Sequence, residues 1–235
     1  NAYVQQIVHT CHKRGIHAIG GMSAAIPTND PDKNKHILQQ IIKDKMLEIK
    51  NGCDGAWVAH PGLIDNIKQL FSSNLKADNQ ILTFPGNKNI TKEILTNIGN
   101  DSIYTEKTLR NNINVSLQYI SAWLSGNGAV ALNNLMEDLA TAEISIHQIK
   151  QWNNYNQFIF NGETVFPIQQ SLDKILEEEY QNMLKENQVG YASNYFNTAK
   201  QILNDYIYKD YHFLPQVANK YLQNVNGFEC IRFNN

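Results

Sequence analysis

The sequence predicts an α/β fold in its first third and a helical region after it. Two short apolar runs, at residues 16–19 and 56–59, alternate with segments whose apolar residues recur at helical spacing. Each run is followed by a loop, GGMSAAIP after the first and HPGL after the second, and helical patterns recur from residue 105 onward. Short buried strands that alternate with helices are typical of parallel sheets, because a parallel connection needs a crossover segment.

The amino-terminal segment is predicted to hold one helix and one strand. Residues 3–14 place apolar side chains on one helical face, and Gly15 ends the helix. A buried strand follows at residues 16–19. We expect the Gly20–Gly21 pair to end this strand and a loop to occupy residues 22–29.

The next helix and strand repeat this order. Asp30 is a suitable N-cap and Pro31 a suitable first residue for a helix that lasts until Gly52. A second buried strand at 56–59 and a helix at 63–71 follow. The pattern suggests an α/β barrel or a doubly wound sheet, and in either one the loops after the strands carry the chemistry. Two strands cannot close a sheet, so we expect the other strands before residue 1 and interpret this part as the end of a (β/α)8 TIM barrel.

The remainder of the chain is predicted to be a polar linker and an all-α domain. The predicted helices lie at 91–98, 105–124, 138–152, 172–186, 194–208 and 214–222. The expected division is therefore residues 1–75 as the last βα units of the barrel, 76–104 as a linker and 105–235 as a helical domain.

Composition excludes several classes of function. The chain has 235 residues, a net charge of -2 and scattered lysines, so there is no electrostatic case for nucleic acid or an anionic membrane as partner. No apolar run approaches the roughly 20 residues that span a bilayer. The chain begins without Met and in a helical pattern, and we expect it to be a piece of a longer polypeptide.

The three cysteines, Cys11, Cys53 and Cys230, lie far apart and lack the spacing of a metal site. A reducing compartment is the expectation. Cys53 is either a reactive thiol or a buried, inert side chain, and the second interpretation is favoured.

The triplet Met136-Glu137-Asp138 is the main candidate for chemistry. It follows a glycine-containing loop at 126–128 and is predicted to open the helix at 138–152. Acidic residues at a helix start are favoured by the macrodipole and the unpaired N–H groups, which is a purely structural interpretation. The alternative is that one carboxylate is a catalytic base.

Three segments together resemble the A-type branch of the malate synthase family. They are RGIHAIGGMSAAIP at 14–27, DKMLEIKNGCDGAWVAHPGL at 44–63 and RNNINVSLQYISAWLSGNGAVALNNLMEDLATAEISIHQIKQW at 110–152. The resemblance implies a TIM barrel whose mouth is covered by a C-terminal helical domain. It also implies a transferase of the glyoxylate bypass and tricarboxylic acid metabolism, which condenses acetyl-CoA with glyoxylate and hydrolyses the product to (S)-malate and CoA. This chain would be less than half of such an enzyme.

The family resemblance assigns the general base to Asp138, the last residue of the MED triplet. The methyl hydrogens of a thioester are weakly acidic, so a base must be held close to the methyl carbon while the enolate oxygen meets a donor or a positive group. Met136 would pack against the thioester. Glu137 is expected to be structural.

Four further residues are implied as substrate-binding. Trp57 would close the pocket around glyoxylate and the acetyl group, although a strand Trp is as often plain core. His60 and Pro61 would line the channel for the pantetheine arm. Met22 follows two glycines whose missing side chains let a backbone approach a ligand. Each of the last three, like Met136, has loop packing as an equal alternative.

The resemblance also implies Mg²⁺, which would chelate glyoxylate and polarise its carbonyl. The acidic ligands and the enolate-stabilising arginine of the family belong to strands that precede residue 1, so no metal ligand is expected in this chain. Asp54 is a tempting ligand, but it precedes a strand and so lies at the wrong end of a barrel.

The sequence departs from the family pattern in two places. Ile146 and Lys150 stand where Arg and Trp are common, and we expect this change to alter how the helix contacts its neighbours. The ending Arg232-Phe233-Asn234-Asn235 is not the Ser-Lys-Leu peroxisomal signal, which favours a cytoplasmic location.

Two other functions are left open. A related acyl-CoA C–C lyase on a TIM barrel is one, although a long helical domain with MED argues against it. The other is a non-catalytic helical fragment that only binds its missing half. We expect the isolated chain to be inactive, because an incomplete barrel exposes apolar surface and strand edges.

Overall fold

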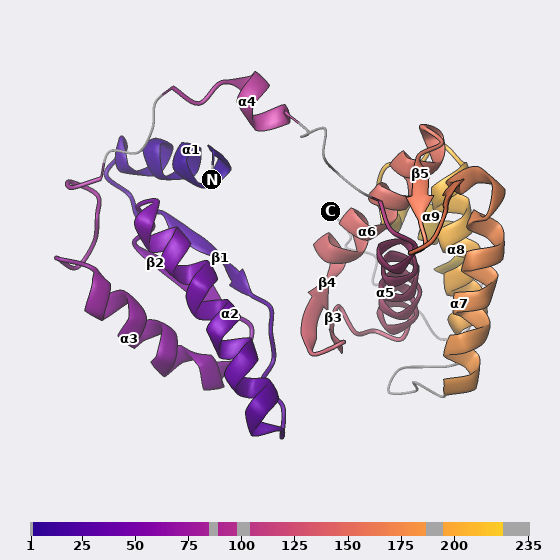
Figure 1. The fold of residues 1–235 in the computed structure, drawn as a ribbon, viewed down its shortest axis with the longest axis horizontal. Coiled ribbons are helices and arrows are strands. Elements are labelled where there is room, and N and C mark those ends of the chain that lie inside the picture. Colours follow the sequence, from indigo (N-terminus) through magenta and orange to yellow (C-terminus); the bar gives the residue numbers. More distant parts are fainter. Residues whose placement is uncertain (1, 85–88, 98–103, 187–194, 223–235) are drawn as a thin grey trace, which may run out of the picture. The chain divides into compact units, whose positions relative to one another are not determined.

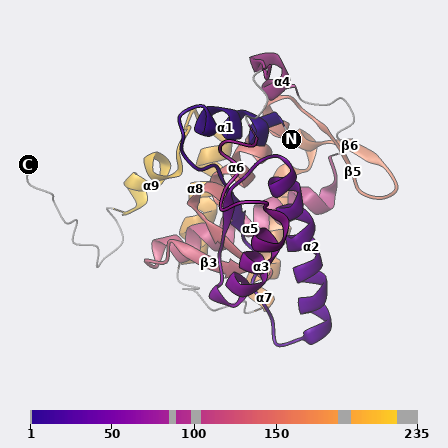
Figure 2. The ribbon, with the colours of Figure 1, turned by 90° about the vertical axis from the view of Figure 1, so that its left-hand side faces the viewer.

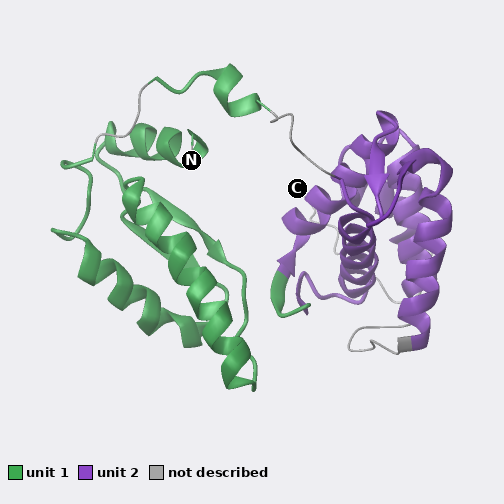
Figure 3. Cartoon of the chain, viewed as in Figure 1, with its two compact units in different colours: residues 1–100, 133–136 green, residues 101–132, 137–235 purple. Residues whose placement is uncertain are grey.

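The computed structural model describes residues 2–84, 89–97, 104–186 and 195–222 (Figure 1). Its chain divides into two compact units, which Figure 3 colours separately. Unit 1 comprises residues 1–100 and 133–136, and unit 2 comprises 101–132 and 137–235. Among the described residues, no helix is both long and apolar enough to cross a membrane.

Unit 1 contains the predicted strand–helix–strand arrangement. Its elements are α1 (Ala2–His12), β1 (Ile19–Ser23), α2 (Pro31–Lys50), β2 (Gly55–Val58), a 3-10 turn (Pro61–Leu63), α3 (Ile64–Asn74) and α4 (Lys92–Thr96). β1 and β2 are parallel, and α2 packs against both β1 and α3 (Figure 2). The prediction of a crossover helix between parallel strands is confirmed.

The start of α2 follows the predicted chemistry. The Asp30 carboxylate accepts hydrogen bonds from the N–H groups of Asp32 and Lys33, and Pro31 occupies the first helical position. The fixed φ of proline and the capping oxygen both favour a helix at this point.

The predicted position of β1 was wrong, because the predicted strand starts three residues and ends four residues too early. The strand covers Ile19–Ser23, so it includes the Gly20–Gly21 pair and Met22. Its extent follows from pairing, because Ile19 lies opposite Gly55 and Ser23 lies opposite Val58 on β2. Gly20 does not end the strand. A Cβ at this position would lie 1.9 Å from Oε2 of Glu48, so its missing side chain makes room for α2.

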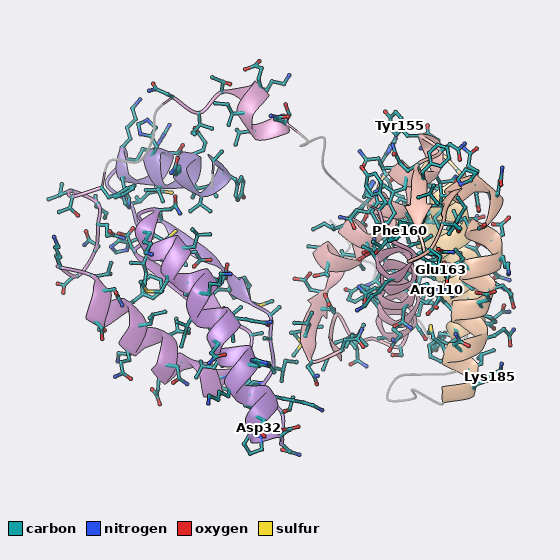
Figure 4. All side chains as sticks on the ribbon, viewed as in Figure 1. Asp32, Arg110, Tyr155, Phe160, Glu163 and Lys185 are labelled. Carbon is teal, nitrogen blue, oxygen red and sulfur yellow. The ribbon has the colours of Figure 1, made fainter. Side chains whose placement is uncertain are left out.

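Unit 2 is organised around one buried helix. Its elements are α5 (Glu106–Leu124), β3 (Ala129–Leu132), β4 (Leu135–Asp138, of which the first two residues belong to unit 1), α6 (Leu139–Asn154), β5 (Phe158–Phe160), β6 (Val165–Pro167), a 3-10 turn (Ile168–Gln170), α7 (Leu172–Glu186), α8 (Phe196–Tyr208) and α9 (Leu214–Leu222). α5 contacts α6, α7 and α8, and its apolar face supplies much of the core. Arg110, labelled in Figure 4, joins α5 to α7 through Glu178 and Glu179.

Two short hairpins interrupt the helices of unit 2 and were not predicted. β3 and β4 are joined by two residues, Asn133 and Asn134, whose φ angles of 50° and 62° are left-handed. Such a pair fits the tight turn that matches the twist of a hairpin. β5 and β6 form an antiparallel pair in which Ile159 lies opposite Phe166.

Candidate active site

Asp138 ends β4 and caps α6. The sequence predicted that the triplet opens the helix. In the structure Met136, Glu137 and Asp138 all lie in the strand, and the helix begins at Leu139 with Asp138 as its N-cap. Asp138 Oδ1 accepts a hydrogen bond from the N–H of Thr141 at 3.0 Å and lies 3.2 Å from its hydroxyl. Among the described residues, none donates a hydrogen bond to Oδ2. The cap therefore uses one oxygen of a half-buried carboxylate, and the other oxygen takes no part in the cap.

Glu137 is buried, with 6% of its surface exposed. Burial raises the pKa of Glu137, hydrogen bonding from Thr141 lowers it, and the charge of Asp138 raises it, with a net rise above 4.5. Successive side chains of a strand point to opposite faces, which explains why the two neighbouring carboxylates have different surroundings. These surroundings fit the structural role expected for Glu137.

Tyr119 on α5 supports the loop that leads into the hairpin. Its hydroxyl donates to the carbonyl of Gly128 at 3.0 Å, and the side chain is buried. Burial and the charge of Asp138 raise the pKa of Tyr119. Gly126 in the same loop has a φ of +98°, which favours glycine. Sequence reasoning missed Tyr119, because a tyrosine on the buried face of a helix carries no separate signal.

Met136 and the loop after β1 belong to the same unit and are paired through their backbones. The N–H of Met136 donates to the carbonyl of Ala24 at 2.8 Å, and the N–H of Ile26 donates to the carbonyl of Asn134 at 2.9 Å. Met22 lies just before this loop. The structure therefore brings together two predicted substrate-binding segments that are more than 100 residues apart in the chain.

Trp57 lies on β2 and pairs with Met22 across the sheet. Its side chain is 57% exposed in this chain, so it is not plain core here. His60 accepts a hydrogen bond from the N–H of Gly62 through Nδ1 at 3.0 Å and thereby caps the short turn that begins at Pro61. The binding roles of these residues stay predictions.

Asp54 has a structural environment. Its carboxylate accepts hydrogen bonds from the N–H groups of Gln80 at 2.6 Å and Ala18 at 2.7 Å, and His12 Nε2 lies at 2.9 Å. Burial alone would raise the pKa of Asp54, but these hydrogen bonds lower it to below its ordinary value. This carboxylate links α1, the residue before β1 and the segment after α3.

A metal site would need several acidic, histidine or cysteine side chains close together. The described part of the chain contains no group of three or more that could hold a metal ion. The residues present therefore do not fit a Mg²⁺ site by themselves. The expectation that the ligands come from other strands of a barrel stays a prediction.

Cys53 is almost fully buried, with 2% of its surface exposed. Burial and the charges of Glu48 and Asp54 raise the pKa of Cys53 to about 11. Since the thiolate is the nucleophile, this environment favours the inert interpretation. Cys230 and the ending at 232–235 lie outside the described residues.

The two departures on α6 have different environments. Ile146 is fully buried in the core of unit 2. Lys150 donates through Nζ to the carbonyls of Lys209 and Tyr211, both at 2.7 Å. Ile146 therefore contacts the core and Lys150 the turn between α8 and α9, and the expected change in the contacts of this helix stays a prediction.

A parallel strand–helix–strand unit followed by a helical unit defines an α/β protein with a helical extension. Comparisons with known proteins identify the family. The family model "Malate synthase, TIM barrel domain" matches residues 1–98, and "Malate synthase, C-terminal" matches residues 103–221. The chain belongs to the malate synthase family.

Three curated relatives illustrate the similarity. Malate synthase A of Escherichia coli (strain K12) is 44% identical over 70% of this chain and 31% of its own length. Malate synthase of Dictyostelium discoideum is 39% identical over 88% of the chain and 39% of its own length. The glyoxysomal malate synthase of Candida tropicalis is 39% identical over 81% of the chain and 35% of its own length. The chain thus spans well under half of the relatives it matches.

Proposed function

We propose that this chain is the part of a malate synthase that supplies the general base. The enzyme would be an acyltransferase that condenses acetyl-CoA with glyoxylate and releases (S)-malate and CoA, as a step of the glyoxylate bypass and tricarboxylic acid metabolism. The observation that carries the proposal is Asp138, the last residue of MED, whose Oδ2 receives no hydrogen bond from the described residues.

Asp138 is proposed to take a proton from the methyl group of acetyl-CoA. The C–H electron pair is delocalised onto the thioester oxygen as an enolate, whose carbon attacks the aldehyde carbon of glyoxylate. The C=O electron pair of the aldehyde moves to its oxygen, which takes up a proton, and malyl-CoA is formed. Water subsequently cleaves the thioester, and CoA leaves. A base held in fixed geometry is favourable, because the orientation of the reacting groups contributes a large part of the rate.

Substrate contacts are proposed for residues of unit 1. Trp57, with its exposed indole, would contact glyoxylate and the acetyl group, together with Met22 opposite it on β1. Met136 would contact the thioester, and His60 and Pro61 the pantetheine arm. Mg²⁺ is part of the proposed whole enzyme. Because the described residues do not form a site for it, no step is assigned to it here.

The remaining strands of the barrel are the proposed partner of this chain. The described sheet of unit 1 has two strands, and residues of β2 and α3 line an open, mainly apolar groove of about 470 Å³. This exposed surface supports association with the missing part. In this proposal, residues 1–75 end the barrel, 76–104 link it and 105–235 form the covering domain.

A cytoplasmic location belongs to the proposal too, although the relative from Candida tropicalis is named glyoxysomal. A fluorescent fusion of the whole protein, imaged beside a peroxisomal marker, tests it.

The test of the function is Asp138→Asn in the intact enzyme. We expect kcat to fall by about 10²- to 10⁴-fold, the usual contribution of a general base. Acetyl-CoA affinity should change little, and exchange of the acetyl methyl hydrogens with deuterated solvent should stop. Glu137→Gln is the matched control, because it removes the neighbouring carboxylate. Unchanged turnover by Asp138→Asn would exclude Asp138 as the base.

The same preparation separates the alternative functions. A related C–C lyase would cleave malyl-CoA to acetyl-CoA and glyoxylate but would not hydrolyse its thioester. A helical fragment that only binds its partner would leave the assembled protein inactive in both assays.

A further inference from the structure

We propose that Thr141 is a positioning residue, whose hydroxyl holds one oxygen of the Asp138 carboxylate so that the other faces the substrate. The inference rests on the proposed function, because it concerns the same base. It concerns a residue on the first turn of α6 that lies within hydrogen-bond distance of the base.

The cap of α6 adds a side-chain hydroxyl to the backbone donor. In α2, the Asp30 carboxylate accepts two backbone N–H groups, from Asp32 and Lys33, and its other oxygen lies 3.7 Å from Nζ of Lys33. In α6, the N–H of Thr141 and its hydroxyl both lie close to Oδ1 of Asp138, at 3.0 and 3.2 Å. A second donor on the same oxygen opposes rotation of the carboxylate and so opposes exchange of Oδ1 with Oδ2.

A hydroxyl is a suitable group for this task. An ion pair with lysine or arginine would also fix a carboxylate, but its charge would strongly stabilise the ionised form and weaken the base. Among the described residues, the titratable groups that interact with Asp138 are Tyr119 on α5 and Glu137 on β4, and the Glu137 carboxylate shares the Thr141 hydroxyl with Asp138. Neither is a cation. Thr141 thus orients the carboxylate without supplying a positive charge.

The chain offers a matched control at the start of another helix. Thr105 caps α5, and Thr108 stands three residues later, as Thr141 stands three residues after Asp138. The N–H of Thr108 donates to the Thr105 hydroxyl at 3.1 Å, and the two hydroxyls lie 2.8 Å apart. Thr108→Val therefore removes a comparable hydroxyl from a cap that has no proposed part in the reaction.

The experiment compares Thr141→Val, Thr141→Ser and Thr108→Val in the intact enzyme. We expect Thr141→Val to lower kcat at least tenfold, since small misplacements of a reacting group cost about that much or more. KM for acetyl-CoA should stay within about twofold of the wild-type value, because binding contacts are kept. The kinetic isotope effect with trideuteroacetyl-CoA should increase, because proton transfer becomes slower relative to the other steps.

Thr141→Ser should restore kcat and the isotope effect, and Thr108→Val should leave both unchanged. If Thr141→Val does not fold, Thr141→Ala takes its place, because alanine lacks the hydroxyl and favours helix. A wild-type isotope effect and kcat in the valine or alanine variant would overturn the positioning role. If Asp138→Asn is inactive in that case, the proposed function stands. If Asp138→Asn is fully active, both proposals fail.

Discussion

Gly20 and Gly21 are neighbours on β1 but have different surroundings. A Cβ on Gly20 would overlap the Glu48 carboxylate, whereas a Cβ on Gly21 would meet nothing within 4 Å. The Glu48 carboxylate is not free to move aside easily, because its Oε1 accepts from Nζ of the fully buried Lys45 at 2.8 Å. Lys45 Nζ also donates to the carbonyl of Gly21 at 2.7 Å. A buried ion pair thus fixes the side chain that Gly20 accommodates.

We expect Gly20→Ala to lower the free energy of unfolding by about 1–3 kcal/mol, the usual cost of forcing extra volume into a packed site. Gly21→Ala should change it by less than about 0.5 kcal/mol, as at an open position. Urea denaturation of the two variants beside the wild type measures the difference. Equal midpoints for the two variants would show that the Glu48 carboxylate moves without cost.

Single residues divide into those that local sequence predicts and those that it does not. The caps at Asp30 and Asp138 were predictable, because N-capping depends on the residue and its immediate successors. Lys45 and Tyr119 were not. Their roles depend on partners, Glu48 and Gly128, whose proximity is set by packing rather than by spacing.

At the level of elements, long periodic segments were predicted well and short ones were not. The helix predicted at 172–186 is α7 with the same bounds, because fifteen residues give several turns of apolar periodicity. Strands of three or four residues, such as β3 and β5, give too few alternations to be recognised. The paired asparagines 133 and 134 were the available signal for the first hairpin.

The contact between α6 and the α8–α9 turn is polar. Lys150 bonds two carbonyls of that turn. Glu143, two helical turns earlier and more than half buried, accepts from the N–H of Leu214 at 2.6 Å and from the Tyr206 hydroxyl at 2.5 Å. Burial and the charge of Glu143 raise the pKa of Tyr206, so the phenol keeps its proton and donates it. Two side chains of one helix therefore hold both ends of the turn.

We expect Lys150→Met to lower the free energy of unfolding by about 1–2 kcal/mol, because two charge-assisted hydrogen bonds are lost and two carbonyls lose their donor. Lys107→Met is the control. Lys107 is an exposed residue of α5 with no ion pair to the described residues. Thermal unfolding of both variants provides the measurement. A loss no larger than that of the control would mean that these hydrogen bonds contribute nothing to docking of the turn.

At the scale of the whole molecule, unit 1 has the local structure of a barrel and an open sheet. β2 exposes Trp57, and β1 exposes 53% of Ile19. The sequence predicted the two strands of unit 1 and the family, because a part of a protein keeps the order of its family motifs. It did not predict that the tip of the β3–β4 hairpin pairs with the loop after β1, since that contact joins segments over 100 residues apart.

We expect the isolated 235 residues to form no detectable malate from acetyl-CoA and glyoxylate. Co-expression with the preceding barrel strands of the same polypeptide should restore turnover, because the strand edge and the apolar groove would then be covered. Malate formation by the isolated chain would contradict this expectation. Restored turnover with Asp138→Ala in place of Asp138 would show that the activity comes from the added part alone.

Asp138 both caps α6 and carries the proposed chemistry. Asparagine caps helices about as well as aspartate, because its side-chain oxygen accepts the same N–H bond, but its amide is a far weaker base. Fold and reaction are therefore separable at this one position. An asparagine variant should assemble normally and hold acetyl-CoA and glyoxylate together without converting them, which makes it a suitable trap for visualising both substrates before carbon–carbon bond formation.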